Sequence, residues 1–200
     1  MMRIRSILFA ALAVMCMGAI TASAASAAEF EQTAIESEKS PHKLTGKKQK
    51  LTAEGLEGSK VVITCEKVKG TVKFSKTELT APHLEYEECN VAGKAAEVKT
   101  DCTVGVTNGG LVNIGKGEGV KTCFTITTND KSCKIIIKGE QLNKKLVTFK
   151  NNGGNLIIEA AVVGIAFESA TGKACTFKNE NVDGTAGYSG TLEVTGINIK

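Results

Sequence analysis

The sequence predicts an all-β fold, a single-domain antiparallel sandwich or barrel-like structure held by disulfides. Three observations support this prediction. Apolar and polar residues alternate with a period of two along most of the chain, turn signals interrupt the alternation at short intervals, and an even number of cysteines follows an N-terminal export signal. The 21 glycines and the abundance of Thr, Val and Ile agree with roughly ten or more short strands.

Residues 1–28 have the parts of a secretory signal peptide. Arg3 and Arg5 give a positive start, Ile7 to Ile20 is an apolar run, and the stretch TASAASAAEF offers small-residue cleavage sites. A lipoprotein would need Cys16 in a lipobox, but the bulky Met15 precedes it and a long Ala/Ser tail follows. We therefore expect a secreted or extracellular protein, either free or associated with the cell surface. After removal of the signal peptide we expect no insertion into a membrane.

The remaining chain is expected to form one domain. Residues 29–44 are polar and unpatterned, which predicts a flexible N-terminal arm, and residues 45–200 are expected to form the disulfide-stapled β-domain. Without residues 1–28 the chain has lysines but no arginine, and its net charge is about +2. This balance gives no indication of a nucleic-acid partner, and the absence of arginine removes the side chain that binds phosphate in bidentate fashion.

Period-two alternation defines the strands in order. In KVKGTVKFSK, Lys67 and Lys69 alternate with Val68 and Val72, as expected for a half-buried strand. Similar patterns predict strands at 47–52, 61–65, 83–88, 97–107, 111–114, 122–128, 134–138, 146–150, 156–167, 174–177 and 187–199. The stretches TNGG at Thr107, TND at Thr128, KNNGG at Lys150 and SATGK after Phe167 read as turns between them.

Six cysteines remain once the signal peptide is removed: Cys65, Cys89, Cys102, Cys123, Cys133 and Cys175. An even count in an exported chain favours three disulfides, and no C-x-x-C spacing supports a zinc knuckle or a redox motif. Metal ligation and free thiols remain as alternatives. The preferred pairing is 123 with 133, 65 with 89 and 102 with 175. A two-residue turn at Asn129 and Asp130 would place Cys133 opposite Ile126, so a bond to Cys123 needs a wider loop; otherwise each cysteine bonds elsewhere.

Two surface patterns are candidate binding sites with simpler explanations. The lysine row 67, 69, 73 and 76 could bind an acidic polymer, but the glutamates 85, 87 and 88 on the next strand are expected to neutralise it. The stretch NENVDG, 179–184, resembles the opening of a calcium loop, but it begins with Asn and has Gly190 where a bidentate Glu is required. A turn is the preferred interpretation.

Catalytic signals are weaker still. His42 and His83 stand in no recognisable catalytic motif. A glycosidase carboxylate pair could still be drawn from the glutamates, but most of these are better explained as partners of the lysines. The absence of Trp, together with the expected burial of Tyr86 and Tyr188, gives no support to sugar binding. The sequence therefore predicts no enzyme, no catalytic residue, no cofactor and no metal site.

Several segments together resemble a known group of proteins. VVITCEKVKGTVKF, YEECNVAGKAAEVKTDCTVGV, TCFTI, SCKIIIKGEQ and GYSGTLEVTG follow one another as in uncharacterised secreted six-cysteine β-proteins of actinobacteria, a family of unknown function. The resemblance covers nearly the whole chain after the signal. It implies export, six paired cysteines and a single β-domain, and it supplies no activity.

The functional prediction is an exported, non-catalytic β-domain that acts by surface contact with an unknown cell-envelope or extracellular component. The alternative is a secreted module that binds a small ligand or glycan between sheets or in a barrel mouth, and a secreted hydrolase is the third class. An apolar pocket of several hundred cubic ångströms is expected for the alternative, and a flat surface covered by Lys and Glu for the first prediction.

Overall fold

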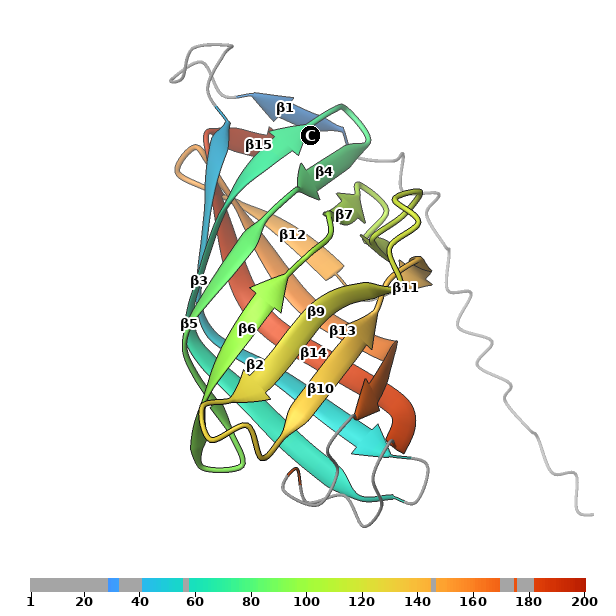
Figure 1. Ribbon diagram of the computed structural model, residues 1–200. Coiled ribbons are helices and arrows are strands. Elements are labelled where there is room, and N and C mark those ends of the chain that lie inside the picture. Colours follow the sequence, from blue (N-terminus) through green and yellow to red (C-terminus); the bar gives the residue numbers. More distant parts are fainter. Residues whose placement is uncertain (1–28, 33–40, 56–57, 145–146, 170–174, 176–181) are drawn as a thin grey trace, which may run out of the picture.

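The structure, a computed structural model, describes residues 29–32, 41–55, 58–144, 147–169, 175 and 182–200. Within these residues the regular elements are β-strands, which confirms the all-β prediction. Figure 1 shows a barrel with further strands gathered at one end. The predicted signal peptide, residues 1–28, lies outside the described residues. No helix in the described part of the chain is long and apolar enough to cross a membrane.

Eight antiparallel strands close the barrel. Their order around the barrel follows their order in the chain, and the last strand returns to pair with the first along ten residues. The strands are β2 (His42–Gly55), β3 (Lys60–Phe74), β5 (Leu84–Val91), β6 (Lys94–Thr100), β9 (Thr122–Thr128), β10 (Lys134–Lys138), β13 (Asn155–Ser169) and β14 (Val182–Thr195). Closure leaves no free edge between these strands, since each has a hydrogen-bonded neighbour on both sides.

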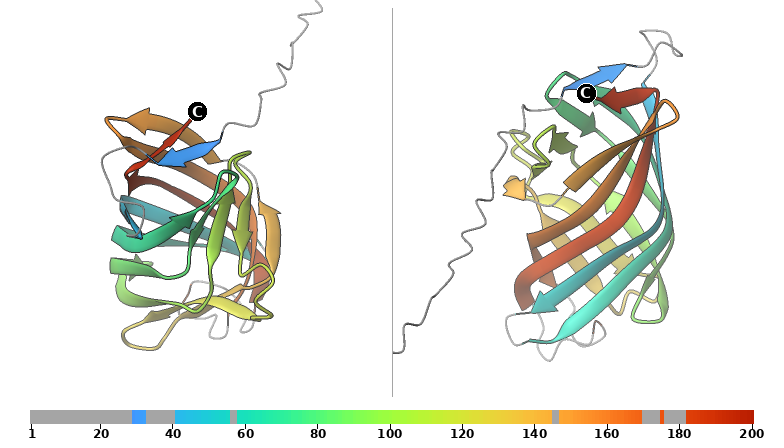
Figure 2. Two further views of the ribbon diagram at one scale, coloured as in Figure 1. Left: turned by 90° about the horizontal axis from the view of Figure 1, so that it is seen from above. Right: turned by 180° about the vertical axis from the view of Figure 1, so that it is seen from behind.

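Of the seven remaining strands in the described residues, the first precedes the barrel strands, the last follows them, and the other five are insertions between them. They are β1 (Phe30–Gln32), β4 (Glu78–Ala81), β7 (Val104–Thr107), β8 (Val112–Ile114), β11 (Gln141–Lys144), β12 (Val147–Asn152) and β15 (Ile197–Ile199). Strands β3, β6 and β10 all run toward the same end of the antiparallel barrel, so the segments that follow them emerge together. There β4, β7, β8 and β11 pair in that order into a small sheet, which we call the cap sheet (Figures 1 and 2).

Burial along the barrel strands follows the period of two, and in the neighbouring strands β2, β3 and β5 the alternation changes phase at one common level. In β3 the buried residues are Val61, Ile63 and Cys65, and then Val68 and Val72. The alternation therefore changes phase between Cys65 and Val68. Matching changes occur on both neighbours, where Lys48 of β2 and Glu88 of β5 have positive φ angles of 53° and 54°. Such bulges bend a sheet, and these lie side by side across three strands of the wall.

The strand predictions are largely confirmed. Strands β9 and β10 have the predicted bounds, while segments 61–65 and 67–76 belong to the single strand β3, and segment 97–107 divides into β6 and β7. Strands β4 and β11 were not predicted, and segment 174–177 lies outside the described residues except for Cys175. The turn KNNGG is confirmed, since Asn152 pairs with Asn155 and both intervening glycines have positive φ.

The predicted flexible arm differs from the structure in its described part. Phe30 is buried and β1 pairs with β15, while β2 begins at His42, two residues before the arm was expected to end. Both described ends of the arm are thus paired strands. The polar composition of the segment concealed this because single apolar residues, such as Phe30, anchor a strand as short as three residues.

The cysteines form three disulfides, as predicted, but only one of the three preferred pairs is present. Cys65 bonds Cys89, while Cys102 bonds Cys123 and Cys133 bonds Cys175. The preferred pairs 123 with 133 and 102 with 175 are wrong. Residues 129–132 form a four-residue loop that sets Cys133 beside Thr128, so Cys123 lies at the far end of β9 from it. The loop is therefore wider than two residues, and each cysteine bonds elsewhere.

Candidate ligand cavity

The interior of the barrel contains an apolar cavity of about 130 Å³. Side chains of the barrel wall and of the cap sheet line it together. The principal apolar lining residues are Leu51, Ile63, Leu84, Val98, Val104, Val106, Val112, Ile114, Phe124, Ile126, Ile137, Val147, Ile158, Val162, Ile165 and Leu192. An engineered cavity of about 150 Å³ with a similar lining binds benzene, so this volume fits a molecule of about one six-membered ring.

Several inward-facing side chains are only partly buried, although they lie on the core side of their strands. Leu51, Val98, Phe124, Tyr86 and Tyr188 belong to this group, and all of them line the cavity. Strand alternation turns them away from the outer face of the barrel. Their remaining accessible surface therefore faces the cavity.

Gln49 is the buried polar residue of the cavity wall, with 2% of its surface exposed. Its side-chain Nε2 donates hydrogen bonds to the backbone carbonyl of Lys47 at 2.9 Å and to that of Thr191 at 3.1 Å. Both amide protons are thereby used, which fixes the orientation of the group. The amide oxygen is left as an acceptor on the cavity side.

Two glycines make room for this amide. A Cβ at Gly190 would lie 1.9 Å from Gln49 Oε1, and a Cβ at Gly46 would lie 2.8 Å from Gln49 Nε2. Both glycines belong to strands that pair beside the bulge, β14 and β2 respectively. The Gln49 side chain thus occupies a niche that exists because these positions have no side chain.

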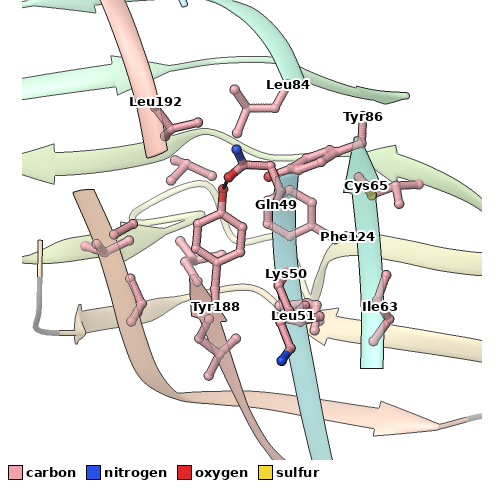
Figure 3. Close-up of a pocket in the computed structure, with 18 of the residues that line it drawn as sticks. Gln49, Lys50, Leu51, Ile63, Cys65, Leu84, Tyr86, Phe124, Tyr188 and Leu192 are labelled. Carbon is pink, nitrogen blue, oxygen red and sulfur yellow. Dashed lines mark hydrogen bonds between the residues drawn. The ribbon is translucent and has the colours of Figure 1, made fainter. Parts of the chain in front are cut away.

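The two tyrosines of the chain stand next to Gln49 (Figure 3). The Tyr188 hydroxyl donates a hydrogen bond to Gln49 Oε1. Burial raises the pKa of Tyr86 to about 12. Burial also raises the pKa of Tyr188, with Tyr86 acting in the same direction. Gln49, Tyr188 and Tyr86, which we call the polar triad, are therefore neutral at ordinary pH.

The chemistry of this cavity suits binding. Among the described residues its lining contains no His, Asp, Glu or free Cys, and the one charged residue among them, Lys50, is an exposed residue between inward-facing Gln49 and Leu51. Cys65 belongs to the lining, but its sulfur is bonded to Cys89. Among the described residues, no group of three or more His, Cys, Asp or Glu is placed to hold a metal ion.

The histidines considered from sequence lie outside this cavity lining. His42 is 5% exposed, its Nδ1 is 2.9 Å from the carbonyl oxygen of Thr195, and its ring packs edge-on against Phe74. His83 is exposed, 3.8 Å from Glu85. His42 therefore holds the start of β2 to the end of β14.

Two of the four lysines in the row, Lys67 and Lys69, meet two of the predicted glutamates across strands β3 and β5. Lys67 pairs with Glu88 at 2.5 Å and Lys69 with Glu87 at 2.6 Å, all at exposed positions. Lys76 lies 3.5 Å from Glu29. The outer face here is neutralised internally, although such exposed pairs add little stability. Residues 179–181 of the calcium-like stretch lie outside the described residues.

Sequence reasoning missed Gln49 and the role of the tyrosines. Gln49 stands in the polar stretch KKQK, where nothing distinguishes it from a solvated side chain. The bulge at Lys48 turns it inward. Comparisons of the chain with known protein families, curated proteins and solved structures found no match. The resemblance to secreted actinobacterial six-cysteine proteins therefore stays a prediction.

Proposed function

We propose that this protein is a secreted binding protein that carries a small, largely apolar molecule inside its barrel. The apolar cavity lined jointly by barrel and cap sheet carries this proposal. Burial of apolar ligand surface is favourable at about 25 cal/mol per Å², and a preformed cavity avoids the cost of ordering the site. The cavity is smaller than the several hundred cubic ångströms expected for a drug-sized ligand, which restricts the ligand to about one ring.

Export is part of the proposal. It is supported by the N-terminal sequence pattern and by three disulfides, which persist in oxidising compartments outside the cytosol. A non-catalytic role is supported by the neutral polar side chains, Gln49, Tyr86 and Tyr188, that the described lining turns toward the cavity. Contact with an envelope component has less support, because the Lys and Glu face that would carry it pairs internally.

The test is a binding screen on the disulfide-intact protein without residues 1–28. One-ring apolar compounds such as toluene are added, and amide chemical shifts in NMR spectra locate the binding site. We expect shifts at cavity residues, including Val98 and Phe124. Binding that perturbs exposed strand faces and leaves the cavity residues unchanged would overturn the proposal, as would a screen without a ligand.

A matched pair of substitutions identifies the cavity as the site. Val98→Phe places a ring in the cavity, while Val62→Phe makes the same change on the outer face of β3, where Val62 is 40% exposed. We expect Val98→Phe to weaken toluene binding at least tenfold and Val62→Phe to leave it unchanged. Equal affinities of the two variants would contradict the assignment.

A further inference from the structure

We propose that the ligand is a neutral molecule with a hydroxyl group, which the polar triad recognises by hydrogen bonding at Tyr86. This inference rests on the proposed function and names the class of ligand. It starts from the arrangement of one continuous polar cluster on an otherwise apolar cavity wall, in which Gln49, Tyr188 and Tyr86 lie next to one another (Figure 3).

The direction of the hydrogen bonds follows from the fixed end of the triad. Gln49 spends both of its amide protons on the backbone carbonyls of Lys47 and Thr191, so it presents its oxygen to Tyr188. The hydroxyl of Tyr188 must then donate its only proton to that oxygen. Toward Tyr86, therefore, the Tyr188 oxygen is an acceptor.

Tyr86 stands at the open end of this series. If its hydroxyl donates to the Tyr188 oxygen, the Tyr86 oxygen keeps acceptor capacity toward the cavity, and a ligand that satisfies it must be a donor. Its ring is held edge-on against Phe124, with ring centroids 6.2 Å apart. A ligand hydroxyl is the smallest group that fits this requirement within the available volume.

Charge limits the ligand further. The lining residues that the structure describes include no inward cationic side chain, and an isolated anion transferred to an apolar site pays a large desolvation cost. The two tyrosines keep their protons because burial disfavours their ionised forms. A carboxylate is therefore a poor ligand, whereas a neutral ring alcohol or phenol is suited to the site.

The test compares phenol with toluene, which has the same shape with a methyl group in place of the hydroxyl. Dissociation constants are measured calorimetrically for the wild type and for Tyr86→Phe. A buried donor without a partner is costly, so we expect the variant to weaken phenol binding about fivefold to tenfold relative to toluene. Val98→Ala is the control for cavity shape, since it should change both affinities by a similar factor.

The outcomes separate this inference from the proposed function. If toluene binds in the cavity and Tyr86→Phe affects both ligands equally, ligand binding stands and hydroxyl recognition is overturned. If neither ligand binds the wild type, the proposed function itself fails. Benzaldehyde can accept a hydrogen bond but cannot donate one, so a Tyr86→Phe variant that loses as much affinity for benzaldehyde as for phenol would overturn the assignment of the ligand as a donor. Wild-type protein that binds benzoate as tightly as phenol would overturn the requirement for a neutral ligand.

A wild-type measurement keeps the test valid if Tyr86→Phe fails to fold. The chain has no Trp and two Tyr, both in the polar triad, so its near-ultraviolet absorption reports directly on the cavity. Cyclohexanol does not absorb in this range. We expect added cyclohexanol to shift the tyrosine absorption in a saturable manner, and to shift it further than methylcyclohexane does. Identical difference spectra for the two compounds would contradict hydroxyl recognition.

Discussion

At the scale of single residues, the polar triad depends on small neighbours. Gln49 is held by two backbone carbonyls and by Tyr188, and it fits because Gly46 and Gly190 leave its volume free. Buried polar groups are tolerated when their hydrogen-bonding capacity is satisfied, and removal of one partner costs more than the bond contributes. The triad is therefore sensitive to changes that add even one carbon atom beside it.

Gly190→Ala tests this sensitivity. The new methyl group would overlap Gln49 Oε1, so the Gln49 amide must move and lose its hydrogen bonds. We expect the free energy of unfolding to fall by about 1–3 kcal/mol. Gly187→Ala on the same strand is the control, because its nearest contact would be an ordinary 3.6 Å to the Val162 carbonyl oxygen. Denaturant unfolding of both variants measures the difference, and equal stability would show that Gln49 is not confined.

The tyrosines give a second prediction at this scale. Tyr86 has a folded pKa of about 12, above its ordinary value of 10.0, so the folded protein binds more protons than the unfolded chain between these values. The stabilisation from Tyr86 is complete below pH 10 and is lost as pH rises toward 12. Tyrosinate absorbance of the folded protein should stay low at pH 10, and half-ionisation there before unfolding would contradict burial.

At the scale of elements, a carboxylate organises the glycine-rich connection from β8 to β9. Glu140 accepts hydrogen bonds from the backbone N–H groups of Gly117 at 3.1 Å and Gly119 at 2.6 Å. These bonds lower the pKa of Glu140. Gly117 and Gly119 both have positive φ, which turns successive N–H groups toward one anion. The anion site of this loop is thus occupied by a side chain of the protein.

Glu140→Ala should therefore loosen this connection without unfolding the barrel. We expect faster amide hydrogen exchange at Gly117 and Gly119, whereas Glu66→Ala, at an exposed position without a hydrogen bond to a described residue, should leave exchange unchanged. Because folding lowers the pKa of Glu140, the stabilisation that Glu140 contributes to the folded state is present above the unfolded pKa of 4.5. This stabilisation is lost as the pH falls through the folded pKa. Unchanged exchange in Glu140→Ala would show that the loop is held by other contacts.

Strand prediction illustrates which elements a sequence pattern can identify. Strands β9 and β10 alternate clearly, and their bounds follow from the pattern. Strands β4 and β11 have four residues each, which is too short for a period-two pattern to stand out from the neighbouring sequence. Gln49 of the polar triad was not predicted because the bulge at Lys48 reverses the alternation along β2, so Gln49 points into the barrel and not outward.

At the scale of the whole molecule, the disulfides join segments that the barrel brings together. Cys65 and Cys89 are directly opposed on β3 and β5, Cys102 joins the end of β6 to β9, and Cys133 joins the β9–β10 loop to the β13–β14 connection. Their sequence separations are 24, 21 and 42 residues. On the chain-entropy model each contributes about 3–4 kcal/mol, in total comparable to the stability of a typical domain.

Reduction is therefore expected to unfold the protein at room temperature or bring it close to unfolding. Circular dichroism with and without a reducing agent measures this, and a fully folded reduced protein would contradict it. Thiol titration of the denatured, unreduced protein should find no free thiols, and peptide mapping should recover the pairs 65–89, 102–123 and 133–175. Two or more reactive thiols would refute the three-disulfide framework.

The all-β class, the period-two strands and the presence of paired cysteines can be predicted from the amino-acid sequence, because alternation and turn residues are local properties of the chain. The pairing of the cysteines, the closure of the barrel through β2 and β14 and the contribution of the cap sheet to the cavity become visible only in the folded molecule. These depend on contacts between residues far apart in sequence, such as Gln49 with Tyr188 and Gly190, whose proximity follows from strand register and bulges.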